Sequence, residues 1–181
     1  MKKITVLIVG ITLLVIAAFL IKHARNLGFN QGYAPTQPIA FSHKLHAGDQ
    51  KLQCLYCHFA ADKGRHAGIP PTELCLNCHK YIQTQSPEIA KIKKAVDTKT
   101  PVKWVKVHHL PDFAYFNHSQ HVNVAGLACQ KCHGEVEKMQ VLKQQETLSM
   151  GWCIECHRDN QIAPPNDHKN AGAGDCAKCH Y

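Results

Sequence analysis

The chain has 181 residues and a formal net charge of +8, and these two numbers already limit its function. Half of that charge comes from Lys2, Lys3, Lys22 and Arg25, which flank one apolar segment. No run of interleaved basic and aromatic residues indicates nucleic acid as a partner. The length suits one modest domain or a few small modules.

The first element in chain order is an apolar segment, residues 4–21, without a charged side chain. As an α-helix it would span about 27 Å, close to the hydrocarbon thickness of a bilayer. A cleavable signal peptide is the alternative, but the segment exceeds the usual apolar core of such peptides, and no convincing cleavage site follows it. We predict a retained transmembrane anchor over residues 1–25, followed by a Gly-, Gln- and Pro-rich linker over residues 26–40.

All ten cysteines lie in five copies of the signature Cys-x-x-Cys-His. The two thiols stand one helical turn apart and can add to the two vinyl groups of one porphyrin, and the adjacent imidazole then reaches the iron as proximal ligand. The sequence therefore predicts five covalent c-type haems. The predicted attachment sites are Cys54, Cys57, Cys75, Cys78, Cys129, Cys132, Cys153, Cys156, Cys176 and Cys179. The predicted proximal ligands are His58, His79, His133, His157 and His180.

Zinc sites and disulfides are the alternatives for paired cysteines. Three gaps, from Cys57 to Cys75, Cys132 to Cys153 and Cys156 to Cys176, would fit a four-cysteine zinc ribbon. Five pairs, however, cannot be shared evenly among two-pair sites, and neither alternative explains a histidine after every second cysteine. Haem attachment explains both, and it requires an oxidising compartment. We therefore expect the haem domain on the periplasmic or outer side of the cytoplasmic membrane.

Five haems would leave about 30 residues of the exported chain around each one, too few for an ordinary apolar core. We predict a mostly α-helical fold with extensive irregular coil, wrapped around stacked haems. Ser86-Pro87-Glu88 predicts the start of a helix that carries Ile89, Ile92 and Val96 on one face, and residues 98–101 predict its end. The alternation in Val102-Lys103-Trp104 predicts a short strand.

An internal repeat precedes two of the signatures. Phe41-Ser42-His43-Lys44-Leu45-His46 is matched by Phe116-Asn117-His118-Ser119-Gln120-His121, and the last histidine of each lies eight residues before a signature cysteine. Each repeat is followed by a second signature. We therefore predict two haem modules, residues 41–80 and 116–158, and a tail haem unit, residues 159–181.

Histidines outside the signatures are candidates for the distal position on each iron. The two histidines of one repeat leave a helical turn on the same side, yet one iron has a single open axial position, so they must serve different haems. The last signature lies next to the end of the sequence, so its distal ligand is expected from upstream. The predicted distal ligands are His43, His46, His108, His118 and His121. Further candidates are His66, His109, His168, Met139 and Met150.

Several motifs resemble class III multihaem cytochromes, and more closely the pentahaem cytochrome c subunit of alternative complex III, a bacterial quinol:electron acceptor oxidoreductase. The motifs are residues 38–43 with His46, Ala67-Gly68-Ile69-Pro70, His108 with Leu110-Pro111-Asp112-Phe113, Phe116-Asn117-His118-Ser119 with His121, and Met150-Gly151-Trp152-Cys153.

The resemblance implies a haem relay on the periplasmic face of the membrane, with no catalytic residues and no small-molecule substrate of its own. The implied partners are an iron–sulfur or molybdopterin-like periplasmic subunit, multi-pass quinol-binding membrane subunits, and a monohaem cytochrome c subunit or terminal oxidase. Quinol would react in a neighbouring subunit, because residues 4–21 contain no ionisable group that could bind and deprotonate it.

Two other functions are alternatives to the relay. A free-standing membrane-anchored quinol dehydrogenase, resembling the NapC/NirT type, would meet quinol itself. A multihaem reductase would need one iron with an open face and acid or base groups beside it. The chain has no Cys-x-x-Cys-Lys variant of the kind seen in nitrite reductases.

Overall fold

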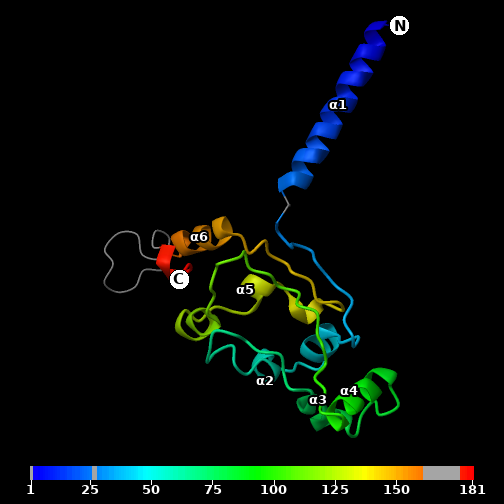
Figure 1. Ribbon diagram of the computed structural model, residues 1–181, viewed down its shortest axis with the longest axis vertical. Coiled ribbons are helices and arrows are strands. Elements are labelled where there is room, and N and C mark those ends of the chain that lie inside the picture. Colours follow the sequence, from blue (N-terminus) through cyan, green and yellow to red (C-terminus); the bar gives the residue numbers. More distant parts are fainter. Residues whose placement is uncertain (1, 26–27, 161–175) are drawn as a thin grey trace.

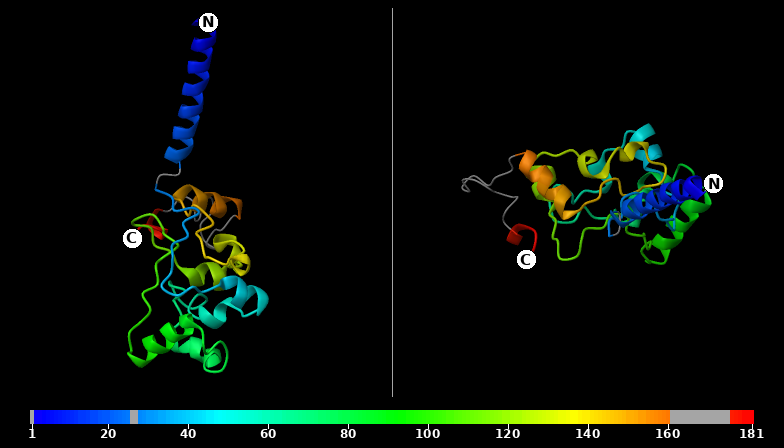
Figure 2. Two further views of the ribbon diagram at one scale, coloured as in Figure 1. Left: turned by 90° about the vertical axis from the view of Figure 1, so that its right-hand side faces the viewer. Right: turned by 90° about the horizontal axis from the view of Figure 1, so that it is seen from above.

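The computed structural model describes residues 2–25, 28–160 and 176–181, and these residues form helices and connections without strands. A long helix, α1 (Lys2–Arg25), projects from a domain of short helices and long irregular segments (Figures 1 and 2). The predicted fold class is therefore confirmed. The other α-helices are α2 (Cys54–Cys57), α3 (Thr72–His79), α4 (Pro87–Asp97), α5 (Gln130–His133) and α6 (Met150–Asp159). Two π-helical turns, η1 (Lys44–Asp49) and η2 (Gln120–Val124), and two 3-10 turns, η3 (Val136–Lys138) and η4 (Cys176–Lys178), complete the described elements.

Helix α1 is long and apolar enough to cross a membrane. Its apolar span, Lys3–Lys22, has a mean hydropathy of 3.0, and no part of it is buried against the rest of the described chain. A fully exposed helix of this composition suits a lipid environment, either as a membrane anchor or as a signal sequence.

Helix α4 begins and ends where the sequence predicts. The Ser86 hydroxyl accepts a hydrogen bond from the Glu88 backbone N–H at 3.3 Å, and Thr98 caps the other end. Ile89 and Ile92 on its inner face pack against Ile39. This small cluster is most of the polypeptide's own core, because the only apolar side chains buried in the described part are Ile39, Ala61, Ile89, Ile92 and Val107.

The predicted strand at residues 102–104 is wrong. This segment has no strand partner in the described chain; instead the Gln37 side chain pairs with the backbone of Val105, donating to its carbonyl and accepting from its N–H, both at 2.9 Å. Val102 and Trp104 both pack against the cluster around α4. The alternation therefore reflects packing of a single extended segment, held by an amide side chain that imitates a neighbouring strand.

Gln144 joins three segments of the domain and is completely buried, with 0% of its surface exposed. Its backbone pairs with the segment that follows α1, accepting from Gly32 at 2.7 Å and donating to Tyr33 at 3.0 Å. Its side-chain oxygen accepts from the His109 N–H at 2.9 Å, and its side-chain nitrogen donates to the Glu146 carbonyl at 2.9 Å. Every polar group of this side chain is thus used inside the protein.

We predict that Gln144→Leu destabilises the haem-loaded domain by about 2–4 kcal/mol, because it leaves the partly buried His109 N–H and Glu146 carbonyl without partners. The exposed Gln85 offers a matched control, and Gln85→Leu is expected to change stability by less than about 0.5 kcal/mol. Denaturant unfolding of the holoproteins measures both changes. Equal unfolding midpoints for the two variants would contradict the role given to Gln144.

Candidate haem attachment and iron-ligand sites

Every signature lies on or beside a helical turn. The first forms α2, the second ends α3, the third lies at α5, the fourth is inside α6 and the fifth is at η4. Helical turns bring cysteines three positions apart to one side of the chain, as attachment to one porphyrin requires. All ten thiols are free, with no disulfide between them. The cysteine chemistry therefore fits covalent haem.

Backbone carbonyls fix the ring orientation of three signature histidines. His58 Nδ1 lies 2.8 Å from the Gly68 carbonyl oxygen, and His180 Nδ1 lies 2.8 Å from the Phe113 carbonyl oxygen. His79 Nδ1 has the same kind of partner at 3.2 Å. Because a carbonyl can only accept, Nδ1 must carry the hydrogen, and Nε2 keeps its lone pair. This is the tautomer that metal-binding histidines use, so these residues fit an iron at Nε2.

The second histidine of each repeat is held in the same way. His46 Nδ1 donates to the Ser42 carbonyl at 2.8 Å, and His121 Nδ1 donates to the Asn117 carbonyl at 2.9 Å. Both acceptors lie four residues earlier and precede the π-helical turns η1 and η2. The sequence repeat is therefore also a repeat of hydrogen bonding.

One phenylalanine orients both histidines of each repeat. Phe41 meets the His43 ring edge-on at a centroid distance of 4.9 Å and stacks on the His46 ring at 4.4 Å. The other repeat has the same arrangement, with Phe116 edge-on to one histidine at 4.8 Å and stacked on the other at 4.3 Å. Such aromatic contacts limit ring rotation and so hold each imidazole in place.

Three predicted distal histidines each face a signature histidine. The ring centroids are 6.1 Å apart for His46 and His79, 5.9 Å for His121 and His157, and 6.4 Å for His118 and His133. Two imidazoles on opposite sides of one metal, each with a metal–nitrogen bond of about 2 Å, have centroids about 6 Å apart. The three observed spacings match that requirement, so these pairs fit two-imidazole ligation of one iron.

His43 belongs to a half-buried histidine cluster. Its Nδ1 is buried without a hydrogen-bond partner. Burial, and then the nearby imidazole of His58, lowers the pKa of His43 to about 4. Burial, and then His108, likewise lowers the pKa of His133 to about 4. Both rings are therefore neutral at neutral pH, as a metal ligand must be.

The remaining candidates differ in the nitrogen that they leave available. His108 Nε2 lies 3.1 Å from His133 Nδ1, with the ring centroids 4.4 Å apart, too close for a metal between them. His109 donates Nε2 to the Lys106 carbonyl at 3.1 Å. His66 is exposed and follows Arg65, whose carbonyl accepts from His118 Nδ1 at 2.8 Å.

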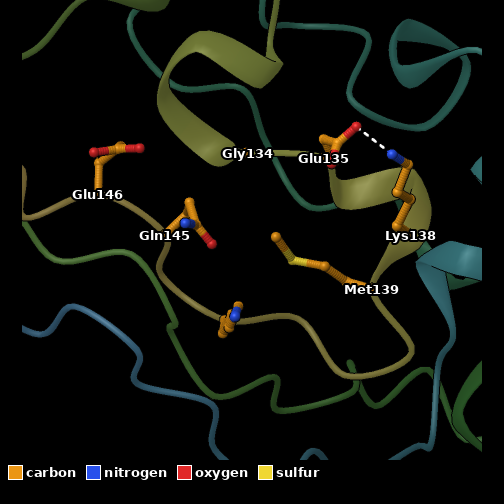
Figure 3. Close-up of a pocket in the computed structure, with 7 residues that line it drawn as sticks. Gly134, Glu135, Lys138, Met139, Gln145 and Glu146 are labelled. Atoms are coloured by element: carbon orange, nitrogen blue, oxygen red, sulfur yellow. Dashed lines mark hydrogen bonds and ion pairs between the residues drawn. The ribbon is translucent and has the colours of Figure 1, made fainter.

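The two methionine candidates lie at the exposed start of a helix and beside a pocket. Met150 is 59% exposed at the start of α6. Met139 lines an open pocket, where its side chain extends toward Gln145 (Figure 3). His168 lies outside the described residues.

The five signatures follow one another in space, in an order that differs from the sequence. Burial and neighbouring thiols raise the pKa values of several cysteines, to about 11 for Cys132, and these neighbours identify adjacent signatures. The adjacent thiols are Cys75 and Cys57, Cys54 and Cys129, Cys132 and Cys156, and Cys153 and Cys179. The spatial order is therefore second, first, third, fourth and fifth. Figure 1 shows the same progression from α3 through α2, α5 and α6 to the C-terminus.

The carbonyl acceptors are functional positions that sequence reasoning missed. An acceptor carbonyl has no side-chain signature, so Ile82 could not be recognised, and Ser42 and Asn117 were noticed only as members of the repeat. Gly68 and Phe113 lie within two motifs already singled out, Ala67-Gly68-Ile69-Pro70 and Leu110-Pro111-Asp112-Phe113. Those motifs were recognisable in the sequence, but nothing in the sequence indicated that their carbonyls accept hydrogen bonds from histidines.

Comparisons with known proteins support the same chemistry. Residues 114–181 match the family described as cytochrome c7 and related cytochrome c. The chain is also 29% identical over 165 residues to the menaquinone reductase multihaem cytochrome c subunit of Nitratidesulfovibrio vulgaris, an alignment that covers 80% of this chain and 76% of that protein. Together with the signatures and the ring orientations, these matches lead to one conclusion: the chain contains a multihaem cytochrome c domain, which holds covalently attached c-type haem.

Proposed function

We propose that this chain is an electron-relay subunit with five c-type haems, belonging to a membrane complex that reacts with quinol or quinone. When bound, a c-type haem supplies an iron centre that takes up and releases one electron. The three histidine pairs about 6 Å apart carry the proposal, because imidazoles on both faces of an iron leave no position for a substrate. With the distal ligands proposed below for the remaining irons, the chain itself would have no catalytic residue.

The internal repeat assigns the distal ligands of four irons. In the second module the first histidine of the repeat faces the third signature, and the second histidine faces the fourth. In the first module His46 faces His79 of the second signature. By the same rule His43 would bind the iron of the first signature opposite His58, the neighbour that, after burial, does most to lower the pKa of His43.

For the fifth iron we propose His66 in place of His108. Arg65 places its guanidinium 5.2 Å from the centre of the Tyr181 ring, so the segment that carries His66 reaches the fifth signature. His108 instead presents Nε2 to His133 Nδ1 at 3.1 Å, and it would act as the hydrogen-bond partner of that ligand.

The spatial order of the signatures supports a relay along the domain. The modules over residues 41–80 and 116–158 would adjoin at the first and third haems, and the tail unit over residues 159–181 would extend the row. In this order, each signature has a thiol beside a thiol of the next signature. The chain's part in electron transfer would thus be to hold neighbouring irons close and to orient their imidazoles.

The identity of the complex is the finer part of the proposal. The relative belongs, by its name, to a menaquinone reductase, which supports a place for this chain among multihaem subunits of quinone-linked complexes. We propose a complex of the alternative complex III type, with α1 as a single-pass anchor and the haem domain in the periplasm. Its partners would be an iron–sulfur subunit, multi-pass quinol-binding subunits, and a monohaem cytochrome c or oxidase. The relative's name favours the opposite direction, delivery of electrons to menaquinone, as a second candidate.

Ligand substitutions test the iron assignments. His46→Ala should leave one iron with five ligands, because the partner of His79 is lost, and electron paramagnetic resonance should then show one high-spin haem that binds carbon monoxide. His66→Ala should do the same at the fifth haem. The matched controls His109→Ala and His108→Ala should keep all five haems low-spin. A high-spin signal in His108→Ala and none in His66→Ala would reverse the assignment of the fifth iron.

Isolation of the complex from its native membrane tests the proposed function. The pyridine haemochrome assay should return five haems for this chain, and the chain should co-purify with multi-pass subunits. Quinol-dependent reduction of cytochrome c by the complex would support the alternative complex III type, whereas reduction of a menaquinone analogue by a reduced donor alone would support the reverse direction. Migration of the chain by itself with retained quinol oxidation would point to the NapC/NirT type.

A further inference from the structure

The fifth signature is held by a strained turn. His180 Nδ1 donates to the carbonyl of Phe113 at 2.8 Å, across 67 positions of sequence. Phe113 has φ of 64°, in the left-handed region that bulky side chains rarely adopt. A backbone outlier that touches a predicted iron ligand is a reason to look for a role.

The turn around Phe113 has the form of a type II turn. The Ala114 N–H donates to the Pro111 carbonyl at 3.3 Å, and Phe113 is the residue of this turn with positive φ. Phe113 therefore occupies the third position, where glycine or asparagine is normally required. Its side chain is 82% exposed, so packing of the ring does not account for the strain.

The same device is present elsewhere in the chain with the residue that suits it. His58, the histidine of the first signature, donates Nδ1 to the carbonyl of Gly68 at 2.8 Å, and Gly68 has φ of 77°. Glycine adopts this conformation without steric cost. Two signature histidines therefore donate hydrogen bonds to carbonyls of left-handed residues, one in a favourable conformation and one strained.

Neighbouring contacts hold the strained residue in place. The Tyr115 N–H donates to the Cys179 carbonyl at 2.7 Å, directly beside the bond between His180 and Phe113. The rings of Tyr115 and Tyr181 stack with centroids 4.7 Å apart, and the Arg65 guanidinium lies over both rings. These bonds compensate for the unfavourable φ, as is required for a strained residue to persist.

We propose that Phe113 is a positioning residue for the fifth haem: its left-handed backbone directs the carbonyl at His180 Nδ1 and thereby sets the orientation and donor strength of His180. A hydrogen bond at Nδ1 makes the imidazole a stronger electron donor, which stabilises the oxidised iron and lowers its reduction potential. This inference rests on the proposed role of His180 as an iron ligand.

Two substitutions separate the backbone from the side chain. Phe113→Gly keeps the left-handed conformation without strain, so all five reduction potentials should remain as in the wild type. Phe113→Val places a β-branched residue where φ is positive, so the turn should change and the carbonyl should leave His180. In that variant one of the five potentials should rise and its low-spin resonance should shift, or the fifth signature should fail to take up haem. Redox titration followed by optical and paramagnetic resonance spectra, with the pyridine haemochrome count, measures these outcomes.

A control variant completes the test. Tyr81 is 83% exposed and, unlike Phe113, is not among the residues with positive φ, and it lies two residues after the second signature. Tyr81→Val should therefore leave all potentials unchanged. The inference would be overturned if Phe113→Val kept five haems with wild-type reduction potentials. It would also be overturned if Phe113→Gly and Phe113→Val shifted the potentials equally or lost haem equally. A wild-type chain that carries fewer than five haems would instead overturn the proposed function.

Discussion

A carbonyl oxygen can only accept a hydrogen bond, and this constraint governs the histidines on which the domain depends. Where a carbonyl faces Nδ1, the ring must carry its hydrogen there and present an unprotonated Nε2 on the other side. Six histidines, three from signatures and three from the predicted distal set, have this arrangement. Irregular backbone is suited to the task, because carbonyls outside helices are free to turn toward a side chain.

The apolar core of the described residues is small, and this limits how the irregular fold can be stabilised. Five buried apolar side chains in the described part are too few to stabilise a domain of this size by burial alone. Separate contacts each stabilise a local region: the stacking of Phe41 and Phe116 on the repeat histidines, the hydrogen bonds of Gln144, and the apolar cluster around α4. Covalent haem would join these regions, so attachment and folding are expected to be coupled, as they are in small metal-dependent domains.

The sequence was informative where a side chain itself carries the chemistry. The signatures, the repeat and the Ser86 cap were recognisable because cysteine, histidine and a helix N-cap have defined spacings. The strand predicted at residues 102–104 failed because alternation reports which side chains face inward, and not which group satisfies the backbone. In this protein the Gln37 side chain takes that place. The motif around Phe113 was recognisable, but its role as a long-range acceptor leaves no local pattern.

The adjacency of Cys54 and Cys129 gives the domain an unexpected symmetry. These cysteines begin the leading signatures of the two modules, so equivalent parts of the repeat meet each other, as identical surfaces do in a twofold dimer. The two predicted modules resemble a pair of two-signature units fused head to head within one polypeptide. The fifth signature has no counterpart beyond the second, and it alone makes the two ends of the row different. The row of signatures, which would otherwise read the same from either end, is therefore directional.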